Sequence, residues 1–219
     1  MVIRQDFIMR MIEQLAAAFS RVFAGQPVSE ISDPQLAMVE LDDALSEVLH
    51  VRAELLDVQP EDMLEAFTPQ LAAEAARIFV ARAQLARRLG RAQAWQVSVR
   101  FATRGLAEGI GHGFHTGQGT AIDLLREVLR DETLASAHSN QELSVLWTTI
   151  FEHEASRRRL ATAEDAIFAA IALGTETEKL QERGLLFFTQ LLELDDEDIA
   201  QGGLTRAEIV EALAELRGR

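Results

Sequence analysis

Apolar residues recur every three to four positions along most of this chain, which is the spacing of one face of an α-helix. Sustained alternation of apolar and polar residues, the pattern typical of β-strands, is nearly absent. The pattern therefore predicts an all-α fold. In the first expected helix, over residues 3–23, the apolar stripe consists of Ile8, Met11, Ile12, Leu15, Phe19 and Val22.

Capping residues divide the helical pattern into elements. Asp33 and Thr68 each stand directly before a proline, and this order is favoured where a capped helix begins. Gly90 is typical of a helix end and leads at once into the next helical segment, which predicts an antiparallel hairpin. The helices expected from these signals cover residues 34–50, 69–89 and 91–108, with a short helix after Pro60 through Met63, Leu64 and Phe67.

Three capping boxes are expected in the second half of the chain, each with a Ser or Thr three residues before a Glu. They begin at Ser139, Thr175 and Thr205. The first two lie 36 residues apart, close to the period of about 34 residues that marks tetratricopeptide-type repeats of helix pairs.

Two segments resemble parts of tetratricopeptide repeats. AEDAIFAAI at 163–171 resembles the second helix of a repeat, and LARRLG at 85–90, followed by Ala94 and Ala102, resembles the turn and second helix of another. The resemblance implies antiparallel helix pairs in a right-handed tetratricopeptide-like array over residues 59–219, preceded by an N-terminal helical hairpin over residues 1–58.

The opening segment RQDFIMRMIEQL, residues 4–15, resembles the start of an uncharacterised bacterial protein family. Members of that family have a similar first helix followed by tetratricopeptide-like helices. The resemblance supports the fold and leaves the function open.

Composition removes several classes of chemistry. The 219 residues include no cysteine, which excludes a disulfide scaffold, a thiolate zinc site, an iron–sulfur cluster and a cysteine nucleophile. The net charge of −14 argues against nucleic acid as a partner. No apolar stretch is long enough to span a membrane, and the N-terminus lacks the pattern of a signal peptide, so we expect a cytoplasmic protein with no membrane partner.

The charge is segregated along the chain. Residues 26–74 contain twelve acids and one arginine, whereas residues 75–107 contain seven arginines and no acid. One interpretation is a surface for an anionic partner, formed by Arg91, Trp95, Arg100 and Arg104. The other, which we favour, is that the basic segment pairs with the acidic helix before it.

The glycine-rich stretch at 109–119 lacks the lysine of a phosphate-binding P-loop and is interpreted as a connector. Its His112 and His115 suggest a metal site, but solvated loop histidines are the favoured interpretation. His153, between two glutamates, is expected at the surface with a raised pKa. The sequence assigns no cofactor and no catalytic residue.

These observations favour a non-enzymatic scaffold or interaction module that binds a protein or peptide. The alternative is a helical ligand-binding or metal-binding protein, or an enzyme, that uses the 109–119 loop with His112 and His115. Association of two copies through the first helix is a further expectation, because that helix has a continuous apolar stripe.

Overall fold

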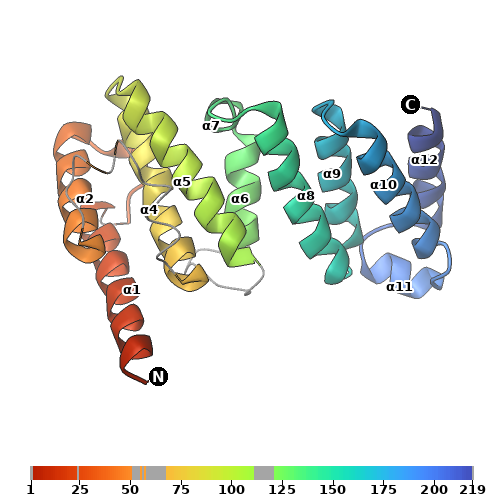
Figure 1. Cartoon of the computed structure of the whole chain (residues 1–219), viewed down its shortest axis with the longest axis horizontal. Coiled ribbons are helices and arrows are strands. Elements are labelled where there is room, and N and C mark those ends of the chain that lie inside the picture. The colour runs from red at the N-terminus through yellow and green to blue at the C-terminus, as the bar shows by residue number, and fades with distance from the viewer. Residues whose placement is uncertain are drawn as a thin grey trace. The chain divides into compact units, whose positions relative to one another are not determined.

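The computed structural model describes residues 2–23, 25–50, 55, 57, 68–110 and 121–218. These residues form helices and connecting turns and contain no β-strand, which confirms the predicted all-α fold (Figure 1). Within the same residues, no helix has both the length and the apolar character needed to cross a membrane. The short helix expected after Pro60 and most of the 109–119 loop lie outside the described residues.

The chain folds as two compact units, residues 1–137 and 138–219. The described helices of the first unit are α1 (Val2–Phe23), the short 3-10 turn η1 (Val28–Glu30), α2 (Pro34–Leu49), α4 (Pro69–Arg88), α5 (Ala92–Ile110), α6 (Ala121–Arg130) and α7 (Glu132–Ala135). Those of the second are α8 (Asn140–Ser156), α9 (Leu160–Ala172), α10 (Thr177–Leu191), α11 (Asp196–Gln201) and α12 (Arg206–Gly218).

The N-terminal helices belong to the first unit, where α1 packs on α2 and both pack on α4. The division expected between residues 58 and 59 falls outside the described residues and stays a prediction. Predicted helix starts at Pro34 and Pro69 are confirmed, because Asp33 accepts a hydrogen bond from the Leu36 amide and Thr68 accepts one from the Leu71 amide.

The hairpin of α4 and α5 forms the centre of the first unit. Gly90 has a φ of 68°, and its amide and that of Arg91 donate to the carbonyls of Arg87 and Ala86 in the last turn of α4. The Phe79 and Phe101 rings stack between the two helices with centroids 3.9 Å apart. Small buried residues bring the helices close, so that a Cβ on Gly105 would lie 2.7 Å from the Ala72 carbonyl oxygen.

Two of the three expected capping boxes are confirmed. Ser139 and Glu142 cap α8 reciprocally, and Thr205 and Glu208 exchange the same pair of bonds before α12. The box at Thr175 is wrong: α10 begins at Thr177 after Glu176, and the Thr175 hydroxyl is buried without a hydrogen-bond partner. The 36-residue interval between the expected caps at Ser139 and Thr175 is therefore not an interval between two capping boxes. The tetratricopeptide-like arrangement stays a prediction.

Candidate functional site: a groove along α4

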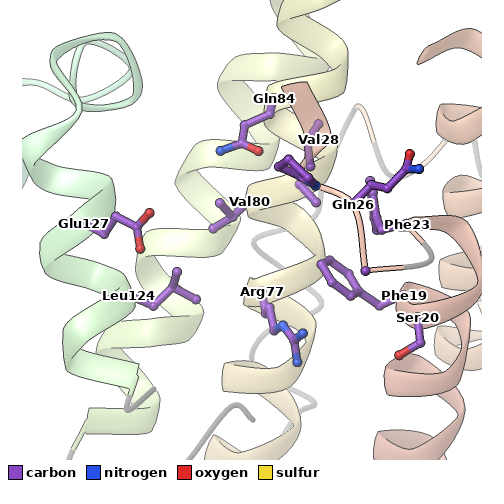
Figure 2. A pocket seen from close by; sticks show the side chains of 13 residues that line it. Phe19, Ser20, Phe23, Gln26, Val28, Arg77, Val80, Gln84, Leu124 and Glu127 are labelled. Carbon is purple, nitrogen blue, oxygen red and sulfur yellow. The ribbon is translucent and has the colours of Figure 1, made fainter. Parts of the chain in front are cut away.

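A groove in the first unit lies over one face of α4. Its volume is about 490 Å³. Figure 2 shows Arg77, Val80 and Gln84 along α4, Phe19, Ser20 and Phe23 on α1, and Leu124 and Glu127 on α6. The turn at residues 25–28 adds Gly25, Gln26, Pro27 and Val28 to the lining.

The α1 wall is fixed by the way this helix ends. Gly25 adopts a φ of 78°, and the Gln26 amide donates to the Phe23 carbonyl at 2.7 Å, which turns the chain back toward α4. Phe23 is buried and Phe19 half-buried, and their ring centroids lie 4.6 Å apart. The α1 wall is therefore aromatic and firmly packed.

Arg77 supplies a cation to the groove. Its guanidinium carbon lies 4.4 Å from the centroid of the Phe19 ring, a cation–π contact between α4 and α1. Burial raises the pKa of Glu74, one turn earlier on α4, while the charge of Arg77 acts in the opposite direction. Arg77 thus places a positive charge beside an aromatic ring in the lining of the groove.

The floor and the α6 wall are mixed in polarity. Val80 is half-buried and packs on a core cluster formed by Ala83, Val99, Val128, Leu134 and Ala137. On α6, Leu124 is half-buried, whereas Glu127 is exposed, as is Gln84 on α4. The groove thus offers apolar contact at its floor and polar groups at its rim.

The arginine surface expected from the sequence is divided in the structure. Arg100 and Arg104 are exposed one turn apart on α5, and the Arg100 Nε donates to the Ala137 carbonyl at 3.3 Å. Arg91 precedes α5 and donates a hydrogen bond to the Gln35 side chain in the first turn of α2 at 3.1 Å. Trp95 is half-buried against the core cluster beneath Val80. Binding of an anionic partner by these four residues stays a prediction.

Another arginine of the same segment pairs with the acidic helix, as the favoured interpretation expects. Arg82 is fully buried, and its guanidinium contacts carboxylate oxygens of Asp42 and Asp57, each at 2.6 Å, and the Ser98 hydroxyl at 2.7 Å. Burial raises the pKa of Asp42, although the hydrogen bond from Arg82 opposes that rise. Arg88 likewise donates to the Val28 and Ile31 carbonyls.

The raised pKa expected for His153 is wrong, and the side chain is half-buried. Burial lowers its pKa, and the charges of Arg157 and Arg159 lower it further. The neighbouring glutamates do not offset this effect, because Glu152 pairs with Arg183 at 2.7 Å and Glu154 is buried, 3.8 Å from Arg159. Among the described residues no group of three or more His, Asp or Glu could hold a metal ion, and His112 and His115 lie outside them.

Sequence patterns do not reveal the groove. The aromatic residues of α1 are recognisable as part of an apolar stripe, but the stripe does not show that α6, a hundred residues later, forms the opposite wall. A second hollow of about 400 Å³ lies between α8 and α10 and is mainly polar, with the Glu152–Arg183 pair and the Glu176–Lys179 pair among its lining.

A model of a protein family matches residues 2–219, so the chain belongs to the family of unknown function DUF6483. This confirms the expectation of an uncharacterised family and extends it from the first helix to the whole chain. No curated protein and no solved structure matches the chain.

Proposed function

We propose that this member of DUF6483 is a non-enzymatic protein-interaction module that binds a peptide segment of another protein in the groove along α4. The observation that carries the proposal is the contact between Arg77, on the α4 floor, and Phe19, on the α1 wall, in a groove of about 490 Å³. Arginine and aromatic side chains are enriched at the centres of protein interfaces, where a few such residues supply most of the binding energy.

The length of the groove suits an extended peptide. From Arg77 to Gln84 the floor follows α4 for seven residues, which is about 10 Å at the helical rise per residue. About three residues of extended chain cover that distance. Apolar side chains of such a segment would contact Phe19, Val80 and Leu124, while its backbone would face the polar rim at Gln84 and Glu127.

A display selection of random peptides against the full chain tests this function. Gln84→Trp fills the groove from an exposed position, and Gln190→Trp, at an exposed position on α10, is the matched control. We expect selected peptides to bind the unmodified chain and the control equally, and to bind Gln84→Trp at least about tenfold more weakly, as loss of an interface centre does. Selection of no peptide, or equal binding to both variants, would overturn the proposal.

A second proposed interaction is the association of two copies of the chain through α1, and exposed apolar side chains on that helix support it. Phe7 and Met9, near the start of α1, are 50% and 40% exposed, while Met11 and Leu15 further along are buried. A second copy would cover these side chains. Light scattering of Phe7→Ser/Met9→Ser should then show a smaller mass than the unmodified chain, and a monomeric unmodified chain would contradict it.

The alternative function, in which this chain binds a ligand or a metal ion or acts as an enzyme through the 109–119 loop, stays a prediction. Elemental analysis of the purified chain tests its metal component, with His112→Ala/His115→Ala as the comparison.

A further inference from the structure

The helix α2 has two different faces. Its inward face packs on α1 and α4 with the buried residues Ala37, Met38, Leu41, Ala44, Leu45, Val48 and Leu49. Its outward stripe consists of Leu36, Val39, Glu40, Asp43 and Glu47, which are all exposed. Leu36, Val39, Asp43 and Glu47 recur at intervals of three to four residues, and Glu40 lies next to Val39, so the stripe follows one side of the helix for about three turns. Figure 1 shows α2 at the edge of its unit.

The outward stripe of α2 begins with apolar side chains. Leu36 is 53% exposed and Val39, one turn later, is 45% exposed. A single exposed leucine is ordinary in a soluble protein, whereas here two large apolar side chains lie on consecutive turns of one helix face. The stripe thus offers an apolar anchor at the N-terminal half of α2.

The rest of the outward stripe is acidic. Asp42 points inward to Arg82, but Glu40, Asp43 and Glu47 are exposed, and none of the ion pairs among the described residues includes them. Their three negative charges lie together along two turns of the helix. Within the part of the chain that the structure describes, binding of a cationic partner would therefore not have to break an ion pair of these carboxylates.

The position of Glu47 on α2 is electrostatically unfavourable. It lies in the last turn of the helix, where the unpaired carbonyls already carry partial negative charge, and that turn contains no basic residue. By contrast, α4 ends in Arg87 and Arg88, and α6 ends in Arg130. A cation supplied by a partner would neutralise both the carboxylates and the end of the helix.

We infer that the outward face of α2 docks a basic amphipathic helix of a partner protein. Its apolar side chains would cover Leu36 and Val39, and lysines or arginines at three-to-four-residue spacing would face Glu40, Asp43 and Glu47. The net charge of −14 attracts such a segment at long range and repels nucleic acid and anionic membranes. The surface is separate from the groove along α4, so this inference does not depend on the proposed function.

A synthetic amphipathic helix with leucines on one face and lysines on the other is the probe. Its binding to the full chain is measured by fluorescence anisotropy at low and high salt. A peptide of the same composition in scrambled order, and one with glutamate in place of lysine, serve as peptide controls. The test variant is Glu40→Gln/Asp43→Asn/Glu47→Gln, and the matched control is Glu178→Gln/Glu182→Gln/Glu193→Gln, which removes three exposed acids from the second unit.

The expected result is that the test variant raises the Kd for the lysine peptide about tenfold or more, that the matched control changes it less than about threefold, and that high salt weakens binding. Leu36→Ser/Val39→Ser should also weaken binding, with little salt dependence of that loss. Equal loss in both triple variants would show attraction by net charge alone and overturn the inference. Equal binding of the scrambled peptide, or absence of binding, would do so as well, and circular dichroism of each variant verifies its folding.

Discussion

At the scale of single residues, Arg82 shows best how the tertiary structure assigns a role that the sequence leaves open. Seven arginines occupy residues 75–107, and the acid-rich helix before them indicates that some of them pair internally. Only the packed structure selects Arg82, because it alone of the charged residues on α4 and α5 is fully buried, next to Asp42. A buried charge must keep its partners, since an unpaired ion in a protein interior costs several kcal/mol.

Removal of Arg82 should destabilise the first unit strongly. Arg82→Met leaves the partly buried carboxylate of Asp42 without its cation, and we expect a loss of about 3 kcal/mol in the free energy of unfolding. Arg82→Met/Asp42→Leu removes both charges of the Arg82–Asp42 pair and leaves only Asp57, whose side chain is 39% exposed to solvent. It should recover much of that loss, because a well-packed apolar pair is often as stable as a buried ion pair. Urea denaturation of both variants measures the difference. A double variant no more stable than Arg82→Met would contradict the electrostatic explanation.

Glu164 is a residue whose ionisation is set by another helix. Its pKa is raised from the ordinary 4.5 to about 7 by burial first, and then by the negative charges of Glu208, Asp165, Glu211 and Glu215. Three of these acids belong to α12, more than forty residues away in the sequence. No local pattern around Glu164 predicts this shift.

The raised pKa of Glu164 makes stability depend on pH. Between about pH 4.5 and 7, Glu164 is protonated in the folded protein and ionised in the unfolded chain. The stability that this protonation contributes is therefore fully present below pH 4.5 and is lost as the pH rises through 7. Glu164→Gln should therefore raise the melting temperature at pH 8 and change it little at pH 5. Glu178→Gln, at an exposed position on α10, is the control. An equal effect of Glu164→Gln at both pH values would contradict the assignment.

At the scale of helices, local capping signals predict starts and ends well where the cap is exposed. Ser139 and Thr205 form the expected boxes because their side chains can turn toward their own helix. Thr175 does not, because its hydroxyl is buried and Glu176 takes a left-handed conformation with a φ of 50°. Gly109, expected in a loop, lies in α5, where a Cβ would come within 2.7 Å of the Ala73 Cβ.

The close approach of α4 and α5 reverses the usual effect of a helical glycine. Gly→Ala in a helix ordinarily stabilises by about 0.5–1 kcal/mol. Gly105→Ala should instead destabilise by about 1–3 kcal/mol, because the new Cβ would lie 2.7 Å from the backbone oxygen of Ala72, which cannot move away alone. Gly184→Ala should lower the free energy of unfolding by less, because the atom closest to the new Cβ is a methyl group at the end of the Leu216 side chain.

Gly218→Ala is the control for the two glycine variants, because a Cβ there meets no atom within 4 Å. Thermal unfolding monitored by circular dichroism should rank the variants with Gly105→Ala least stable. A Gly105→Ala protein as stable as Gly218→Ala would contradict the close packing of α4 against α5.

At the scale of the whole molecule, the chain forms two compact units, and each contains buried apolar side chains of its own. The core of the second includes Ile150, Phe151, Leu160, Ile167, Phe188 and Ile209, and capping boxes open its first and last helices. We expect residues 138–219, expressed alone, to keep a helical circular-dichroism spectrum and to melt cooperatively, because a chain of about 80 residues can bury an adequate core. A non-cooperative melt, with the full chain as control, would contradict this.

The sequence by itself determines the helical class, the helices near Pro34, Pro69, Ser139 and Thr205, and the family, because spacing and caps are local properties of a chain. Only the tertiary structure decides which charged side chains are buried, that α1 and α6 form the two walls of a groove over α4, and that α2 keeps an apolar and acidic face outward. These features depend on contacts between residues far apart in the chain, which helical periodicity does not encode. Burial and charge pairing set their energies, and both arise only when the helices pack.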